Sequence, residues 1–203
     1  MKRAAVGFRV HSGWAAMIAL TLNDGAPTIL ARERVHLIET FTYAFRQPYH
    51  TAEKMPLEKA SAFIERVRDQ AQQMALGTLR KLATDLRARD CKLTACGVLL
   101  SSGRVVANLA QILASHASIH TADGQLFREA ILHAAKRCRL VRYSIRERGA
   151  LSAASEDLRI EPDDLARRIA ELGRPLAAPW SQDEKLATMV ALLAANFARF
   201  NRI

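Results

Sequence analysis

The first 38 residues decide the fold, because three apolar runs follow one another there: AAVGFRV (Ala4–Val10), WAAMIALTL (Trp14–Leu22) and TILARERVHLI (Thr28–Ile38). The junctions between them are HSG at residues 11–13 and NDG at residues 23–25. Small residues and Asn or Asp tolerate the left-handed backbone that tight hairpins need. The sequence therefore predicts a meander of three antiparallel strands.

Helical periods dominate after this meander. From Pro56 to Leu86, apolar residues recur every three or four positions, which predicts one long helix or two helices broken near Gly77. Lys92–Leu100 is short and apolar, as is typical of a central parallel strand. The remaining predicted elements are helices over Arg104–His116 and Thr121–Cys138, a half-exposed strand over Leu140–Ile145, and helices over Pro162–Leu172 and from Ser181 onward. This order predicts an α/β protein in which parallel strands follow the meander and helices cover both faces of the sheet.

Residues 39–55 lack a sustained period and are predicted to form a loop after the third strand. The loop holds four aromatic residues among several basic ones: Phe41, Tyr43, Phe45 and Tyr49. Such a segment can stack on nucleic-acid bases, but packing of the aromatic rings onto the sheet is the favoured interpretation.

Length and composition indicate one domain over residues 1–203, in which residues 146–180 form a helical appendage before the final helix. Half of the residues are hydrophobic, enough for a substantial core. No apolar run reaches the roughly 20 residues of a membrane span. The three cysteines lack metal-binding spacing and indicate packed, reduced thiols. We expect a cytoplasmic protein without a membrane partner.

The net charge of +10 attracts polyanions, and nucleic acid is the obvious partner. Arginine, however, is spread along the whole chain, so the surplus of charge is equally well explained as compositional. Charge alone leaves both interpretations open, and a protein partner is open as well.

The order of elements resembles the ribonuclease H-like fold, and the nearest resemblance is to bacterial Holliday-junction resolvases of the RuvC type. In that family, strand one carries a G-x-D pattern shortly before a turn. Here Gly7-Phe8-Arg9, followed by Ser12-Gly13, occupies that place.

The resemblance implies two divalent metals held by acids on strand one, on strand four and on the last helix. Arg9 stands in place of the first acid, and the predicted fourth strand contains no acid. Only Asp183 and Glu184 match in position, and Glu184 already fits a capping box with Ser181. We therefore expect no bound metal or other cofactor and no two-metal nuclease activity. The resemblance places the start of the last helix near strand one, so we expect an ion pair between Arg9 and Asp183 in place of the metal.

A second constellation follows the predicted fourth strand, where open α/β sheets bind ligands. His116 and His120 are four residues apart and Asp123 follows. A continuous helix would put both imidazoles on one face within reach of one metal, but the favoured interpretation is that His116 closes one helix while Thr121 and Asp123 open the next. We still expect the two histidines and Asp123 to line a cleft rather than to point into the core.

Two functions remain open on the sequence. The first is a non-catalytic module that binds nucleic acid or protein. The second is an enzyme acting on a phosphorylated or nucleotide substrate, with catalytic candidates His116, His120, Asp123, Asp183 and Lys185. Arg9 and Arg128 are candidate ligand-binding residues, because a guanidinium clamps phosphate or carboxylate groups. The sequence does not indicate an oligomeric state.

Overall fold

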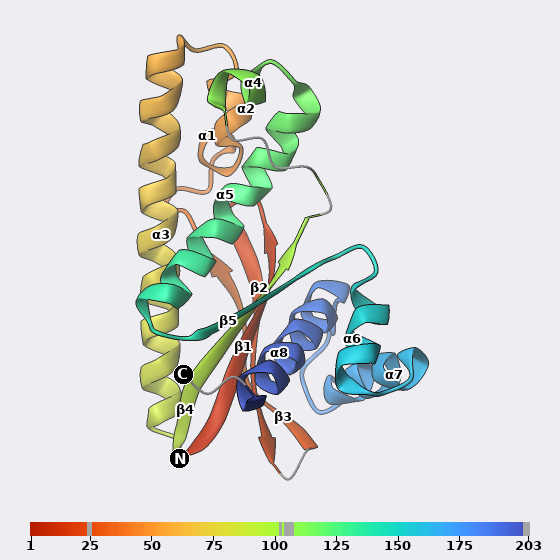
Figure 1. Cartoon of the computed structure of the whole chain (residues 1–203). Helices are drawn as coiled ribbons and strands as arrows, with labels where there is room; N and C mark the ends of the chain where they lie inside the picture. The colour runs from red at the N-terminus through yellow and green to blue at the C-terminus, as the bar shows by residue number, and fades with distance from the viewer. Residues whose placement is uncertain (24–25, 102, 104–107, 201–203) are drawn as a thin grey trace.

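A computed structural model describes residues 1–23, 26–101, 103 and 108–200, and its centre is a mixed five-stranded sheet (Figure 1). The strands, in spatial order, are β3 (Ala26–His36), β2 (Trp14–Asn23), β1 (Lys2–His11), β4 (Cys91–Leu100) and β5 (Val141–Arg146). The strands β1, β2 and β3 pair antiparallel, whereas β4 pairs parallel with β1 and β5 pairs parallel with β4. The predicted meander and the predicted parallel pairing of the fourth strand with the first are confirmed.

The first hairpin closes over two residues, because His11 and Trp14 are directly paired and Ser12 and Gly13 form the turn. Gly13 has a φ of +83°, which a residue with a side chain rarely adopts. In the second turn, residues 24 and 25 lie outside the described residues. At the other side of the sheet, β5 is an edge strand whose residues alternate between half-buried and exposed, as its sequence predicts.

The helices differ from the sequence prediction mainly between the third strand and the fifth. The predicted loop over residues 39–55 is wrong in part, because it contains two short helices, α1 (Tyr43–Arg46) and α2 (Pro48–Ala52). Of the helix predicted over Arg104–His116, the structure has α4 (Leu109–Leu113), and residues 104–107 lie outside the described part. The other helices are α3 (Leu57–Arg87), α5 (His116–Arg137), α6 (Ala150–Leu158), α7 (Pro162–Leu172) and α8 (Gln182–Phe200).

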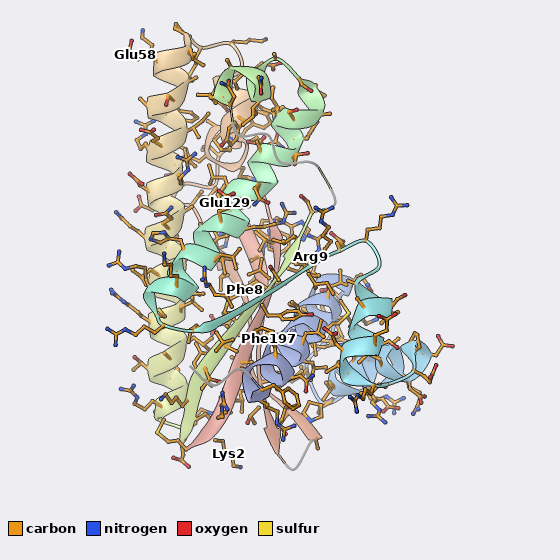
Figure 2. The ribbon with its side chains drawn as sticks, viewed as in Figure 1. Lys2, Phe8, Arg9, Glu58, Glu129 and Phe197 are labelled. Atoms are coloured by element: carbon orange, nitrogen blue, oxygen red, sulfur yellow. The ribbon has the colours of Figure 1, made fainter. Side chains whose placement is uncertain are left out.

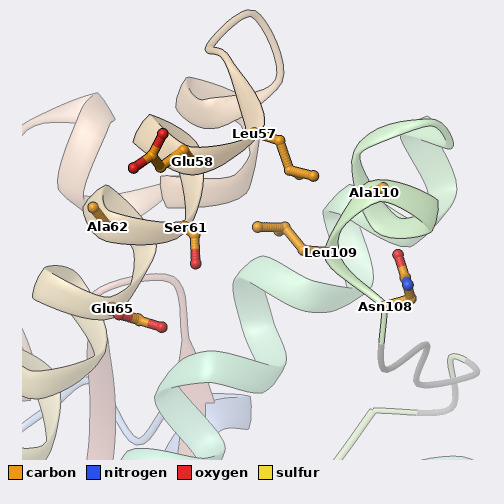
Figure 3. A pocket seen from close by; sticks show the side chains of 8 residues that line it. All are labelled: Leu57, Glu58, Ser61, Ala62, Glu65, Asn108, Leu109 and Ala110. Atoms are coloured by element: carbon orange, nitrogen blue, oxygen red, sulfur yellow. The ribbon is translucent and has the colours of Figure 1, made fainter.

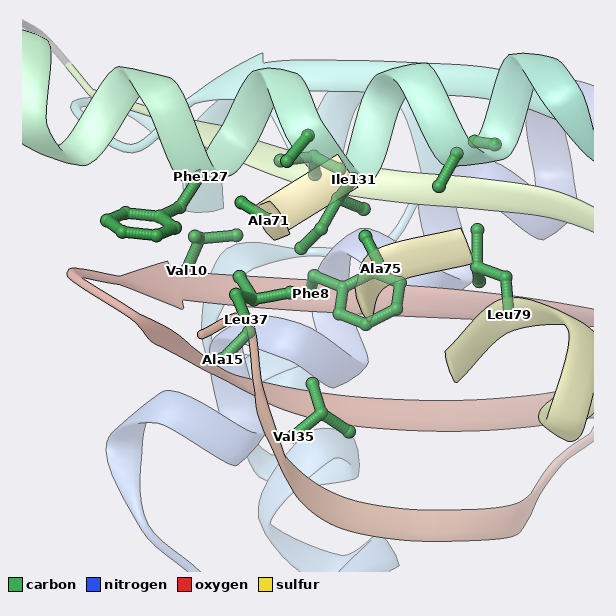
Figure 4. Packing of buried hydrophobic residues seen from close by; sticks show 14 of the residues in the cluster. Phe8, Val10, Ala15, Val35, Leu37, Ala71, Ala75, Leu79, Phe127 and Ile131 are labelled. Atoms are coloured by element: carbon green, nitrogen blue, oxygen red, sulfur yellow. The ribbon is translucent and has the colours of Figure 1, made fainter. Parts of the chain in front are cut away.

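One face of the sheet is covered by α3 and α5, which cross it side by side (Figure 1). Their apolar faces pack on the inward residues of the meander, including Phe8 and Val10 of β1 (Figure 4). Phe127 and Ile131 of α5 and Leu79 of α3 complete this core from the helical side. Burial of such side chains contributes roughly 1.5–3 kcal/mol each.

The opposite face is covered by α8, with α6 and α7 packed outside it (Figure 1). The backbone of α8 lies directly on two glycines of the sheet. A methyl group added at Gly7 would overlap the Ala187 carbonyl oxygen and would lie 2.6 Å from the backbone nitrogen of Ala191. One added at Gly97 would overlap the Val190 carbonyl oxygen. This close approach fixes the position of α8 on β1 and β4.

The short helices α1, α2 and α4, with the first turns of α5, form a helical cap beyond the carboxyl ends of β1 and β4, at the top of Figure 1. None of the described helices is long and apolar enough to cross a membrane.

Candidate functional site

The first polar cluster lies where β1 ends beside the first turn of α8. Side chains of a strand alternate between the two faces of the sheet, so Arg9 shares the α8 face with Gly7 and reaches past the start of that helix. Its side chain is only 16% exposed. The Arg9 Nη2 atom lies 3.0 Å from Glu147 Oε1, and its Nε atom lies 3.8 Å from Asp183 Oδ1 (Figure 2 labels Arg9). Arg9 and Asp183 therefore lie within ion-pair distance, as the sequence suggested, but outside hydrogen-bonding range, and Arg9 Nε has no hydrogen-bond partner among the described residues.

Two different elements supply the carboxylates. Glu147 follows the last residue of β5, and its backbone N–H donates to the Leu100 carbonyl oxygen at 2.9 Å. This bond fixes Glu147 at the carboxyl edge of the sheet. Asp183 lies in the first turn of α8, where the helix dipole favours an acid. The same carboxylate also lies 3.0 Å from the Nε2 atom of His11.

A second guanidinium lies beside Arg9. The Nε atom of Arg128 donates to the Leu99 carbonyl oxygen at 3.2 Å, and the residue is buried. Burial lowers the pKa of Arg128, the charge of Arg9 lowers it further, and the charge of Glu147 opposes this shift. Two guanidinium groups therefore face two carboxylates, so the cluster is close to neutral overall.

The residues of this cluster do not fit the metal pair that a ribonuclease H-like fold implies. Such a pair needs several carboxylates around an open space. Strand β4 carries no acid over Cys91–Leu100, and the two carboxylates that are present already bind Arg9. A guanidinium at the centre also repels a divalent cation.

The second polar cluster lies in the helical cap. Helix α5 begins at His116, so the favoured prediction that His116 closes one helix and that Thr121 and Asp123 open the next is wrong. Both histidines are exposed and share one face, with 3.0 Å between their Nε2 atoms. His50 of α2 joins them, and one ring nitrogen of each of the three histidines lies within 4.8 Å of the others.

Asp123 lies beneath these rings, and the prediction that it lines a cleft is wrong because it is 2% exposed. Its Oδ1 atom accepts from the backbone N–H of Tyr49 at 2.7 Å, and its Oδ2 atom accepts from Nδ1 of His50. Burial raises the pKa of Asp123, although the hydrogen bonds from His50 and Tyr49 oppose that shift.

The candidates named from the sequence thus separate into two groups. His116, His120 and Asp123 meet in the cap, whereas Arg9, Arg128 and Asp183 meet at the sheet edge. Among the described residues, no hydrogen bond or ion pair joins the two groups, and the half-buried Lys185 side chain takes part in neither kind of interaction. Sequence reasoning missed Glu147, His11 and His50. Glu147 had a usable signal, because it is the first acid after the fifth strand.

An open groove of about 770 Å³ lies between the start of α3 and α4 (Figure 3). It is lined by Leu57, Leu109 and small residues, with Glu58 and Glu65 at its α3 side. Neither polar cluster contributes a residue to this groove, and it is not part of the candidate site.

The strand order and the helices on both faces match the ribonuclease H-like fold. Two solved structures share this fold over nearly the whole chain. Thermus thermophilus RuvC in complex with a Holliday junction substrate matches with a TM-score of 0.52 and 14% identity, covering 98% of this chain and 96% of that chain. A second structure of Thermus thermophilus RuvC matches with a TM-score of 0.53 and 14% identity, covering 97% and 96%. No protein-family model and no curated protein matches the sequence.

Proposed function

We propose that this protein is a ribonuclease H-like module that binds nucleic acid and does not cleave it by a two-metal mechanism. The observation that carries the proposal is the position of Arg9. Its guanidinium lies between the carboxylates of Glu147 and Asp183, at the edge where such a fold would need metal ions. Because these charges balance within the protein, the cluster holds the sheet edge together and does not form an anionic metal site.

The binding surface that we propose is a basic strip along edge strand β5 and its flanks, residues 136–148. Glu147 is the only acid of this strip. Its six basic residues are all exposed: Lys136, Arg137, Arg139, Arg142, Arg146 and Arg148. Arg142 and Arg146 point away from α8, because Tyr143 and Ile145 pack on that helix. Near its carboxyl end, Glu147 of the strip contacts Arg9. A run of exposed cations along one sheet edge is the arrangement that follows a phosphate backbone.

Branched DNA is the first probe to use, because the fold is shared with a resolvase whose solved complex contains a Holliday junction substrate. Binding to four-way junction, duplex and single-stranded DNA and to RNA is measured by fluorescence anisotropy over a range of salt concentrations. We expect binding that weakens linearly with the logarithm of the salt concentration, because each phosphate contact releases condensed counterions. Absence of binding to all four probes at low salt would refute the proposal.

Charge reversal locates the surface. In Arg142→Glu/Arg146→Glu, we expect the salt slope to fall by roughly 2, because each phosphate that the protein no longer neutralises lowers the slope by about 0.9. Reversal keeps a charge at each position, so the edge strand stays protected against pairing with other sheets. The matched control is Lys59→Glu/Arg174→Glu, which makes the same charge change at two exposed residues away from β5. Equal losses of affinity in both variants would mean that net charge, and not this strip, drives binding.

Cleavage is tested on the same probes with Mg²⁺ or Mn²⁺. We expect none above background, because the carboxylates that would hold the metals are bound to Arg9. Metal-dependent cleavage that disappears in Asp183→Ala would overturn this part of the proposal and leave the binding result unaffected.

A further inference from the structure

We propose that His50, His116 and His120 bind one Zn²⁺ ion and thereby join α2 to α5. The three rings come from two segments more than 60 residues apart, and they meet at the surface of the helical cap. Their planes are nearly perpendicular: the His50 and His120 ring centroids are 4.4 Å apart at 69°, and those of His116 and His120 are 4.5 Å apart at 81°. The rings therefore meet edge to face and do not stack flat on one another.

The spacing fits a zinc ion. Zn–N bonds are about 2.0–2.1 Å long, so nitrogens on neighbouring corners of a tetrahedron lie roughly 3.4 Å apart. The His116 and His120 Nε2 atoms are 3.0 Å apart, and one ring nitrogen of each of the three histidines lies within 4.8 Å of the others. Adjustments of about an ångström in three side chains bring them to bonding distance. Two of these residues are exposed, so such adjustments meet little resistance.

Asp123 gives the cluster a feature that a chance meeting of histidines lacks. It accepts a hydrogen bond from Nδ1 of His50, which leaves the Nε2 lone pair of that ring as the free ligand. A buried carboxylate that orients a ligating histidine in this way is the usual partner of histidine-bound zinc. The backbone N–H of Tyr49 holds the same carboxylate from the other side, so its orientation is fixed.

The Nε2 atom of His50 remains available to a metal ion, because Asp123 binds the other ring nitrogen. Between His116 and His120, one N–H can donate to the other ring, but that bond does not use the free nitrogen of His50. One Zn²⁺ accepts all three lone pairs at once. Three imidazoles fill three tetrahedral positions, and the exposure of His116 and His120 leaves the fourth to water.

The test uses the full chain, stripped of metal with a chelator and titrated with Zn²⁺ in a calorimeter. We expect one ion per chain. Replacing Zn²⁺ with Co²⁺ should give the intense visible absorption of tetrahedral coordination. In His120→Ala, we expect affinity to fall at least 100-fold, and in Asp123→Asn about 10-fold, because the second variant keeps all three ligands. His133→Ala is the matched control, since His133 is also exposed on α5 and is not part of the cluster.

Unfolding provides a second readout. Zn²⁺ should raise the urea midpoint of the wild type and of His133→Ala, and should leave that of His120→Ala unchanged. If His50→Gln and His120→Ala are folded by circular dichroism and bind Zn²⁺ as tightly as the wild type, the proposal is wrong. It is also wrong if the wild type binds no Zn²⁺, or if His133→Ala loses as much affinity as His120→Ala.

Discussion

Substitution of Gly7 by alanine tests how α8 is held on the sheet. The added methyl group would overlap the Ala187 carbonyl oxygen and would lie 2.6 Å from Ala191 N and 2.9 Å from Ala191 Cβ. Two of these three atoms belong to the backbone, so no side chain can rotate away, and the helix must move off by about 1 Å. A gap of that size forfeits a quarter to a half of the dispersion energy of the atoms that it separates. Nine residues of α8 are buried, so we expect the upper end of the range for overpacking, about 3 kcal/mol.

The measurement is urea unfolding followed by circular dichroism. With a slope of about 2 kcal/mol/M, a loss of about 3 kcal/mol lowers the midpoint by roughly 1.5 M. Gly77→Ala is the matched control, because it makes the same chemical change on the exposed side of α3, where no atom of the described residues lies within 4 Å of the added methyl group. There we expect a gain of about 0.5–1 kcal/mol from helix propensity. A Gly7→Ala midpoint within about 0.2 M of the wild type, a small fraction of the expected shift, would refute the close docking of α8 on β1.

Two further predictions concern the charged contacts of α8 and of the strands beside it. Arg9→Met removes the cation that lies within ion-pair distance of both Glu147 and Asp183, so we expect a loss of about 1 kcal/mol in urea unfolding at pH 7, the upper end for partly exposed ion pairs; an unchanged midpoint would show that the Arg9 ion pairs contribute nothing. Burial tends to raise the pKa of Glu184, but hydrogen bonds from Ser181 and Arg32 outweigh it and lower the pKa below its usual value. A depressed carboxyl pKa stabilises the folded state at pH values above the pKa of the unfolded chain, which is about 4.3 for Glu. This contribution is lost as the pH falls through the pKa of the folded state. The stability difference between the wild type and Glu184→Gln should therefore be largest at pH 7 and shrink below about pH 4, and a difference that is independent of pH would contradict the assignment.

The sheet could be predicted from local sequence because its signals are local. The Ser12-Gly13 turn fixes the register of β1 and β2, since a two-residue hairpin allows one pairing. The alternation over Leu140–Ile145 identified an edge strand with one covered face. The helix over Pro162–Leu172 was bounded by a first-turn proline and a following glycine, and both bounds are confirmed.

The helical cap could not be predicted in the same way. Helices of four and five residues, such as α1 and α2, are too short to show a 3.6-residue period. At the start of α5, the polar residues were assigned the wrong roles. Ser115 is the N-cap and accepts from the backbone N–H of Ser118, whereas the Thr121 hydroxyl bonds back to the Ala117 carbonyl oxygen within the helix. Serine and threonine form both kinds of bond, so composition alone does not distinguish a cap from a helix interior.

The candidate site residues also differ in whether their contacts could be predicted from the sequence. Arg9 and Asp183 were paired from the sequence because the resemblance predicts that strand one lies beside the start of the last helix. His50 could not be joined to His116 and His120, because 66 residues separate His50 from the nearer one and the loop prediction gave no direction to its side chain. Contacts between a helix and an irregular segment far away in the sequence depend on the path of the chain between them. No local sequence pattern predicts that path.

The two polar clusters differ in what they leave unused. At the sheet edge, every carboxylate that would attract a cation already has Arg9 or His11 beside it, so the charges balance within the protein. In the cap, Asp123 accepts from Tyr49 and His50, and one ring nitrogen of each of the three histidines lies within 4.8 Å of the others. A metal ion is therefore disfavoured at the sheet edge, where the ribonuclease H-like fold would place it. It is favoured at the three histidines of the cap, which that fold does not suggest. Because we propose nucleic-acid binding at β5 and metal binding in the cap, Arg142→Glu/Arg146→Glu should change only the binding of nucleic acid and His120→Ala only the binding of metal.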